Sequence, residues 1–322
     1  MNLKAWLFAV SLIPPFAADA AQDPPYPVRP IRLIVPSAAG GGMDTLARVM
    51  GQRLTEQWHQ QVVVDTRAGA TGIIGTEIAA KAAPDGYTLL LAWVSPLTIN
   101  PGLYSKLPYD VERDLAPIMR VATTPNILVV HPSLEVATVK DFIALAKAKP
   151  GQLSYGSSGI GGLSHLAGEL LKNMTGIDIV HVPYKATPPA LLDLIAGRVD
   201  ALFAVAVPAL PHIKTGKLKA IAVSNAKRSP DLPDLPAISE TVPGFDAENW
   251  YGFMAPAGTP QQIILKLNAE VARFLKDPGV TQKLAVQGFV VVADSPQDFA
   301  RYLQSELVKW RTVIKATGIR AE

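Results

Sequence analysis

Three glycine-rich segments in this 322-residue chain each connect an apolar, strand-like run to a helix-like run. They read PSAAGGGMDTLAR (36–48), RAGATGIIG (67–75) and YGSSGIGGLSHLAGELL (155–171). Glycine lets the backbone approach a bound group closely, and the free N–H groups at a helix N-terminus, with the helix dipole, attract anions. Serine hydroxyls in the third segment add hydrogen-bond donors. Three such junctions in one chain predict a site for a small anion.

The same segments argue against a nucleotide and against nucleophilic catalysis. None has the glycine spacing of a dinucleotide-binding loop, and none ends in Gly-Lys-Ser or Gly-Lys-Thr. The run GSSGI differs from the G-x-S-x-G nucleophile elbow because Ile160 takes the last position. Asp44 falls in the first turn of a predicted helix, where it can accept backbone N–H groups and pair with Arg48, four residues on. We expect this pair to shape the first loop.

Composition excludes several other classes of site. Lys plus Arg is 30 and Asp plus Glu is 27, a net charge of +3 without a basic cluster, so no nucleic-acid partner is expected. Cysteine is absent, which excludes disulfides, thiol nucleophiles and thiolate metal sites. The five histidines lack the close spacing of a metal site: His59, His131, His165, His181 and His212. We expect no metal and no other cofactor.

Residues 1–20 have the pattern of a secretory signal peptide. Lys4 supplies a positive charge, AWLFAVSLIPPF an apolar stretch and Ala18-Asp19-Ala20 a small-residue cleavage site. The apolar stretch is too short to span a bilayer, and no later run is long enough. We therefore expect export to the periplasm, with the mature chain beginning near Ala21. Without cysteine, a lipoprotein anchor is not expected.

The elements that must position the three loops alternate between β-branched apolar runs and amphipathic runs, which predicts an α/β protein with largely parallel sheets. The predicted strands are 31–35, 61–65, 87–92, 127–130, 153–155, 178–182, 199–203 and 218–223. The predicted helices are 43–58, 72–82, 138–147, 163–174, 188–196, 260–275, 277–286 and 296–315.

Two segments indicate where the chain crosses between lobes, VATTPNILVV (121–130) and NWYGFMAPAGTP (249–260). The segment between them has its own strand–helix alternation and could close its own sheet. We therefore predict one discontinuous lobe from residues 21–125 and 248–322, and a second lobe from residues 126–247. A cleft between two lobes is a common site for a small ligand.

The loops occur in an ordered series with KAAPDGYTLLLA, NPGLYSKLPYD, VPYKATPPALLDLIAGRVDALF, GKLKAIAVS and GFMAPAGTP. Over about residues 27–322 this series closely resembles the Bug-type extracytoplasmic solute receptors, the binding components of tripartite tricarboxylate transporters. The resemblance implies a two-lobed, type II-like periplasmic-binding-protein fold that closes on a small carboxylate. It also implies a receptor rather than an enzyme, with membrane transporter subunits as partners. We expect a monomer.

The resemblance also carries over ligand-binding residues from three loops and from the motif GRVDALF. These are Ser37, Ala38, Gly41 and Asp44 in the first loop, Ala70, Thr71 and Gly72 in the second, Ser157, Ser158 and His165 in the third, and Asp200 in the motif. Asp200 could instead organise the second lobe.

Two departures from the family pattern bear on the ligand. Ser37 stands where an aromatic residue is usual, and Trp93 stands where small residues are usual. Trp93 is therefore a further candidate for ligand binding, although it could also only pack the lobe. An aliphatic dicarboxylate, an aromatic carboxylate and an amino acid all stay open as ligands.

Other functions are alternatives to that of a transport receptor. A periplasmic hydrolase acting on a small carboxylate or ester would need a nucleophile. Ser224 and Lys227, three residues apart, lack the partner motifs of such a site. The effector domain of a transcription regulator would need a helix-turn-helix segment and no signal peptide. A ligand sensor feeding a two-component system also stays open.

Overall fold

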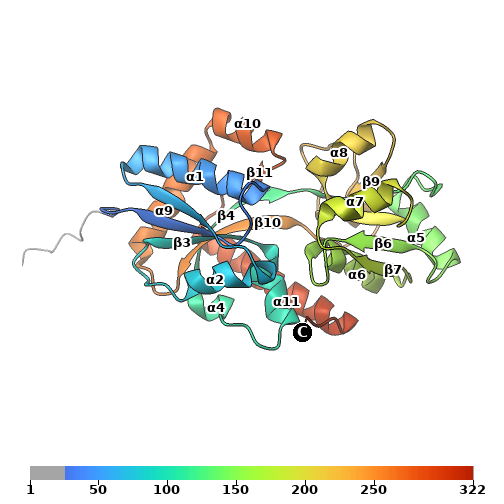
Figure 1. Cartoon of the computed structure of the whole chain (residues 1–322), viewed down its shortest axis with the longest axis horizontal. Coiled ribbons are helices and arrows are strands. Elements are labelled where there is room, and N and C mark those ends of the chain that lie inside the picture. Colours follow the sequence, from blue (N-terminus) through green and yellow to red (C-terminus); the bar gives the residue numbers. More distant parts are fainter. Residues whose placement is uncertain (1–25, 322) are drawn as a thin grey trace, which may run out of the picture.

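The computed structural model describes residues 26–321, so the predicted signal peptide, residues 1–20, lies outside the described residues. The chain forms two lobes that lie side by side, each built on a β-sheet with helices on both faces (Figure 1). Within residues 26–321, no helix is both long and apolar enough to cross a membrane.

The first lobe contains a six-stranded sheet in the order β11-β4-β10-β3-β1-β2. Its strands are β1 (Ile31–Val35), β2 (Val62–Thr66), β3 (Thr88–Trp93), β4 (Leu115–Thr124), β10 (Asn249–Pro256) and β11 (Val290–Val291). The second lobe contains a five-stranded sheet in the order β7-β6-β8-β5-β9. Its strands are β5 (Asn126–Val130), β6 (Ser154–Ser157), β7 (Val180–Pro183), β8 (Ala201–Val205) and β9 (Lys219–Val223).

Both sheets are mixed, which corrects the prediction of largely parallel sheets. Parallel pairing holds for β2-β1-β3 and for β7-β6-β8. The strands next to the lobe crossings pair antiparallel instead: β10 with β3 and β4, and β5 with β8 and β9. Each of these strands lies next to a point where the chain changes sheets, and its direction is set by pairing with strands that are distant in the sequence.

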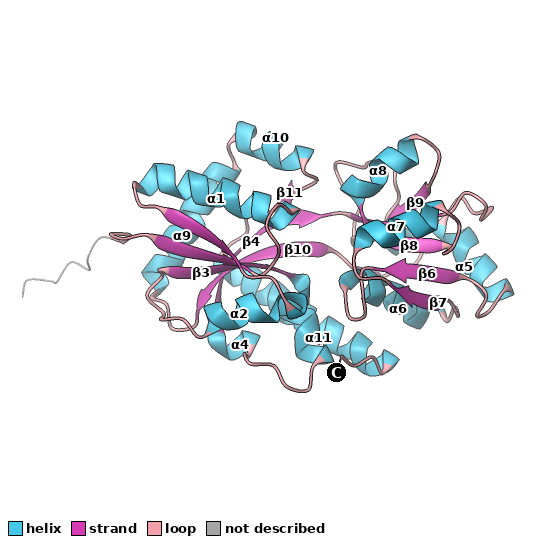
Figure 2. Cartoon of the chain, in the orientation of Figure 1, coloured by secondary structure: helices cyan, strands magenta, loops and turns pink. Residues whose placement is uncertain are grey.

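The two lobes are joined where β4 and β10 lie side by side (Figure 2). β4 ends at Thr124, and β5 of the other sheet begins at Asn126. The chain returns at β10, whose first residue Asn249 is paired with Thr124. Both crossings therefore lie at the same end of one antiparallel strand pair.

Helices cover both faces of the first sheet because its strands alternate their buried side chains. Leu33 and Leu89 pack with α1 (Gly42–Trp58), α9 (Gln261–Leu275) and α10 (Pro278–Val286). Ile34 and Leu90 belong to the core on the opposite face, with α2 (Ile73–Ala80), the π-helical turn η2 (Ser95–Ile99), α3 (Asn100–Leu103) and α11 (Pro296–Thr317). The short helix α4 (Val111–Asp114) leads into β4.

The second sheet is covered in the same way. On one face lie α5 (Val139–Ala148) and α6 (Leu163–Thr175), and on the other α7 (Thr187–Ile195) and α8 (Ala206–Lys214). Thr138 and Asp141 form a capping box at the start of α5, and Gly176 ends α6 in the left-handed region at φ 69°. These local signals explain why α5 and α6 form where they were predicted.

The elements that the sequence did not predict have identifiable causes. Helix α8 contains Pro208 and Pro211, and proline normally ends a helix pattern. Strand β4 contains Pro117, which lies next to a register shift where the strand can lack a hydrogen-bond donor. Strand β11 has only two residues and pairs with β4 at the sheet edge.

Helix α11 packs beneath the first lobe and also contacts α6 of the second (Figure 1). Its buried Glu306, only 2% exposed, accepts hydrogen bonds from the indole N–H groups of Trp250 (3.0 Å) and Trp310 (3.1 Å). Lys309 forms ion pairs with Glu306 and with Asp246, whose Oδ2 lies 3.1 Å from Nζ. Burial opposes the charge of Lys309, but these two carboxylates raise its pKa. The cluster fixes α11 to the start of β10.

Replacing Glu306 with Ala should lower the free energy of unfolding by about 3 kcal/mol or more, because two buried indoles and Lys309 lose their acceptor. Glu306→Gln keeps an oxygen that can accept from an indole N–H and should cost less. Urea unfolding measures both, with Glu56→Ala on the exposed side of α1 as the control. Equal losses in the two Glu306 variants would contradict this role.

Candidate functional site

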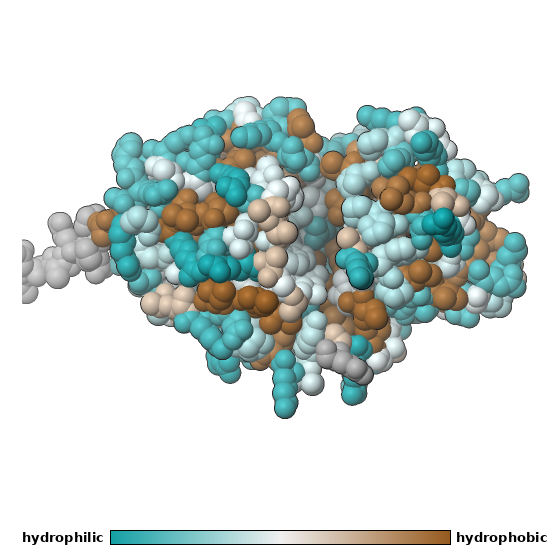
Figure 3. All heavy atoms as spheres, viewed as in Figure 1, coloured by the Kyte–Doolittle hydropathy of each residue, from teal (hydrophilic) through white to brown (hydrophobic). Residues whose placement is uncertain are grey.

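A cavity of about 380 Å³ lies between the two lobes. Figure 3 shows the groove that separates the lobes on the face it draws. The first lobe lines the cavity with Ser37, Met43, Thr71, Trp93, Ser95, Asn249 and Tyr251. The second lobe lines it with Asn126, Ser158, Gly159, Ile160, Gly162, Leu163, Ser164, Thr187, Phe203 and Val205. All three glycine-rich loops therefore reach one cavity.

The lobes touch at two places where a glycine of one lobe receives an aliphatic side chain of the other. A Cβ atom placed on Gly161 would lie 2.4 Å from Cδ1 of Leu103. A Cβ atom placed on Gly288 would lie 2.2 Å from Cγ2 of Val207. Leu103 and Gly288 belong to the first lobe, so the two lobes are closely apposed in this structure.

In the first loop, Ser37 lines the cavity and Asp44 shapes the loop. Asp44 is 4% exposed, and its Oδ2 accepts hydrogen bonds from Gly40 N (2.9 Å) and from Arg48 Nε (3.0 Å). The Gly40 N–H and the Arg48 guanidinium hold the pKa of Asp44 below its usual value, against the opposing effect of burial. Gly41 is the N-cap of α1.

The second loop has an unusual backbone. Four consecutive residues have positive φ angles: Gly69 at 135°, Ala70 at 47°, Thr71 at 50° and Gly72 at 86°. Positive φ costs a residue with a side chain of order 1–3 kcal/mol and is often found at functional sites. Asn100, fully buried, donates from Nδ2 to the carbonyl oxygen of Thr71 (3.1 Å) and so helps to hold this conformation.

Trp93, at the end of β3, packs against the second loop. A Cβ atom on Gly72 would lie 2.8 Å from Cη2 of the Trp93 ring, so only glycine fits beside the indole. The ring also lines the cavity, where Phe203 and Tyr251 supply two more aromatic surfaces. The cavity thus combines polar loops with aromatic walls.

In the third loop, Ser158 and Ser164 both line the cavity and are hydrogen-bonded to each other. Ser164 Oγ lies 2.9 Å from Ser158 N, from which it accepts, and 3.0 Å from Ser158 Oγ. These hydroxyls lie at the start of α6, where the helix dipole favours negative charge.

Two histidines that do not line the cavity support the third loop through hydrogen bonds. His165 Nδ1 accepts from Gly161 N at 3.1 Å, and His181 Nε2 lies 2.6 Å from Ser157 Oγ. The two rings stack with their centroids 3.7 Å apart. Burial, together with the neighbouring His165, lowers the pKa of His181 to about 4, and burial also lowers the pKa of His165. Ser157 and His165 therefore support the loop without lining the cavity.

Asp200 lies at the opposite end of β8 from the cavity residue Val205. Its Oδ2 accepts from Ser154 N (2.7 Å) and Ser154 Oγ (2.9 Å), which ties β8 to β6. Ala38, Gly41, Ala70 and Gly72 lie in the loops beside the cavity without lining it. Of the twelve residues suggested by the sequence, the structure brings Ser37, Thr71, Trp93 and Ser158 to its wall.

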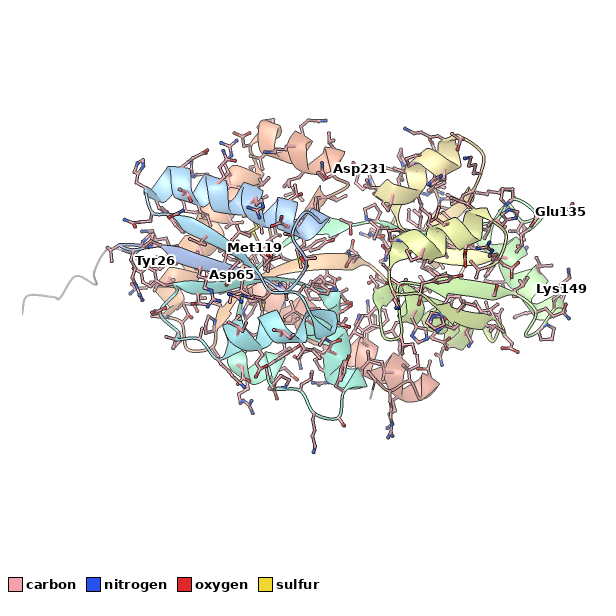
Figure 4. All side chains as sticks on the ribbon, viewed as in Figure 1. Tyr26, Asp65, Met119, Glu135, Lys149 and Asp231 are labelled. Carbon is pink, nitrogen blue, oxygen red and sulfur yellow. The ribbon has the colours of Figure 1, made fainter. Side chains whose placement is uncertain are left out.

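No charged side chain lines the cavity among the residues that the structure describes. Charged side chains such as Glu135 and Lys149 lie at the outer end of the second lobe (Figure 4). Three helices begin at the cavity, since Met43 of α1, Ser164 of α6 and Thr187 of α7 are first-turn residues that line it. Across residues 26–321 there is no group of acidic residues and histidines that could hold a metal ion.

Sequence reasoning missed the lining residues from the lobe crossings, Asn126, Asn249 and Tyr251. The signal was present, because the two predicted crossing segments contain all three. A cavity between two lobes necessarily includes the strands that join them.

Two mixed sheets, two crossings and a neutral cavity between the lobes define a solute-binding protein of the periplasmic-binding-protein class. The model of the tripartite tricarboxylate transporter family receptor matches residues 46–319, and the chain belongs to this family. The family is one of solute-binding receptors and not a class of enzymes.

Individual relatives agree with this assignment. The protein BugT of Bordetella pertussis is 37% identical over 324 residues, covering 99% of each chain. A Rhodopseudomonas palustris protein, Rpa4515 with adipate, superposes with a TM-score of 0.79 at 39% identity, covering 92% of this chain and 99% of its own. MatC of the same organism, with bound malate, gives a TM-score of 0.74 at 31% identity, covering 90% and 100%.

The histidine pair predicts a pH dependence of stability. Because both histidines have folded-state pKa values below the ordinary value of about 6.5, unfolding takes up protons as the pH falls through this range. The free energy of unfolding should be greatest above about pH 6.5 and decrease by about 2 kcal/mol as the pH falls toward 4. Urea unfolding across this range measures the decrease.

His181→Asn removes one titrating ring and should flatten this dependence. His59→Asn is the matched control, because His59 is exposed and its left-handed backbone (φ 52°) suits asparagine. The same pH slope in His181→Asn and in the unmodified protein would show that the stacked pair is not its source.

Proposed function

We propose that this protein captures a small carboxylate in the cleft, closes its lobes around it and delivers it to a tripartite tricarboxylate-type membrane transporter. The observation that carries the proposal is the cavity at which three helices begin and which, within residues 26–321, no charged side chain lines. Helix N-termini and hydroxyl groups can hold an anion in such a site. Its volume of about 380 Å³ suits a small ligand.

In this proposal the lobes move as units. Residues 26–125 with 248–321 form one unit and residues 126–247 the other, with the hinges at Pro125 and Glu248. A ligand that contacts both lobes binds the closed form better and shifts the population toward it. The predicted signal peptide would bring the chain to the periplasm, where it would act as a monomer.

The twelve candidate residues then divide into two roles. Ser37, Thr71, Trp93 and Ser158 would contact the carboxylate directly. Asp44, Ser157 and His165 would hold the loops in place, and Ala38, Gly41, Ala70 and Gly72 would shape their backbone. Asp200 would organise the second lobe through Ser154.

Two ligand classes fit the cavity. Adipate and malate in the structures of the two relatives favour an aliphatic dicarboxylate. The rings of Trp93, Phe203 and Tyr251 favour an aromatic carboxylate. Calorimetry with a panel of both classes, adipate, malate and benzoate among them, identifies the binder.

Ser158→Ala should weaken binding of the best carboxylate about tenfold or more, because a hydrogen bond to a charged group is worth roughly 1.5–3 kcal/mol. Calorimetry at constant pH measures the change. Ser305→Ala, on the exposed side of α11, is the control and should bind normally. Full affinity in Ser158→Ala would argue against the third loop as the anion site.

Trp93→Ala separates the two ligand classes. An aromatic carboxylate should lose roughly 1 kcal/mol or more of binding free energy with the loss of the ring contact, whereas an aliphatic dicarboxylate should bind almost as before. Trp58→Ala, at the far end of α1, controls for the loss of a tryptophan. If Trp93 only packs the lobe, the variant will lose stability and keep its affinity for both classes.

A further inference from the structure

The floor of the cavity is formed where the chain crosses between the lobes. Asn126 is the first residue of β5, and Asn249 and Tyr251 lie at the start of β10. All three line the cavity, and none belongs to the glycine-rich loops. The cavity therefore has two chemically different ends, one of loop hydroxyls and helix N-termini and one of amides and a phenol.

The amides of this floor have unused hydrogen-bonding capacity. Asn249 Nδ2 donates to Thr124 Oγ1 (2.8 Å) and to the Tyr251 hydroxyl (3.0 Å), so its carbonyl oxygen is left over. Asn126 is 3% exposed, and within residues 26–321 no donor reaches its fully buried Oδ1. A buried amide without a partner is unfavourable, so its presence beside a cavity points to a group that the cavity receives.

A second carboxylate would not complement this floor. A carboxylate only accepts hydrogen bonds, so it cannot supply the donor that the carbonyl oxygens of these two amides lack. The Arg120 guanidinium is already paired with other carboxylates, since its Nε lies 3.2 Å from Asp294 Oδ2 and its Nη1 lies 3.8 Å from Glu248 Oε2. Glu248, next to Asn249 in the chain, is itself held by Asn225 Nδ2 at 2.7 Å.

A hydroxyl group complements it well. A hydroxyl both donates and accepts, so it can donate to an unpaired asparagine carbonyl oxygen, which a carboxylate cannot do. The Tyr251 hydroxyl, which accepts a hydrogen bond from Asn249, can also pair with a hydroxyl group of the ligand.

We propose that Asn126, Asn249 and Tyr251 select a carboxylate that carries a hydroxyl group, and that the two asparagines determine this specificity. This inference rests on the proposed function, since it assumes that the loops at the other end hold the carboxylate. The hydroxyl then lies at the strand crossing, where it contacts residues from both lobes.

The test uses pairs of carboxylates that differ by one hydroxyl, measured by calorimetry on the unmodified protein. Suitable pairs are succinate with malate and benzoate with its 3- and 4-hydroxy derivatives. For a pair whose carbon skeleton fits the cavity, the hydroxylated member should bind about tenfold tighter or more. A tenfold difference in affinity corresponds to about 1.4 kcal/mol of binding free energy. Equal affinities within every pair that binds would overturn the inference and leave the proposed function intact.

Asn126→Leu, similar in size but unable to hydrogen-bond, should reduce the preference for the hydroxylated member severalfold, by weakening the binding of that member more than the binding of its partner. Ser158→Ala is the matched control: it should weaken both members by the same factor and preserve their ratio. A preserved ratio in Asn126→Leu would overturn the role of Asn126. Asn249→Leu provides the same test should Asn126→Leu not fold, as judged by circular dichroism.

The two proposals fail in different ways. If no carboxylate of the panel binds the unmodified protein, the proposed function fails and this inference fails with it. If carboxylates bind without any preference for a hydroxyl, only the inference fails.

Discussion

The antiparallel pairing of β4 with β10 is the constraint on which the rest of this structure depends. The pair runs through the middle of the first lobe, where Met119 of β4 is fully buried opposite Phe253 of β10 (Figure 4). At its end, Thr124 is paired with Asn249, and both chain crossings start from there. The pairing thereby fixes where the lobes are joined, where the cleft lies and which side chains form its floor.

Among the residues that the structure describes, no charged side chain lines the cavity, so the proposed binding of an anion would depend on the direction of hydrogen-bond donors rather than on net charge. A lysine or arginine in the cavity would attract any anion over a long range. Helix N-termini and hydroxyl groups act over short distances and require a defined geometry, so they can distinguish ligands by shape. The partly buried cations Arg120 and Lys309 are instead paired with carboxylates near the hinge.

The second and third glycine-rich loops are each held in place by polar side chains that do not line the cavity. Asn100 holds the carbonyl of Thr71 in a loop with four successive positive φ angles. His165 and His181 hold Gly161 and Ser157 in the third loop. Such support keeps donors in place before a ligand arrives, which reduces the ordering cost of binding.

The sequence by itself determined the local elements and the family. Amphipathic spacing and capping residues act over a few residues, so α1, α5, α6 and most strands form where their patterns predict them. The glycine-rich motifs likewise indicated which loops reach the cavity between the lobes. What only the tertiary structure decided was the antiparallel direction of β4, β5 and β10, the neutral lining of the cavity and its floor of Asn126, Asn249 and Tyr251. These features arise from pairs such as Thr124 with Asn249, 125 positions apart in the chain. Local preferences cannot specify such contacts, because they form only when the two crossings come together.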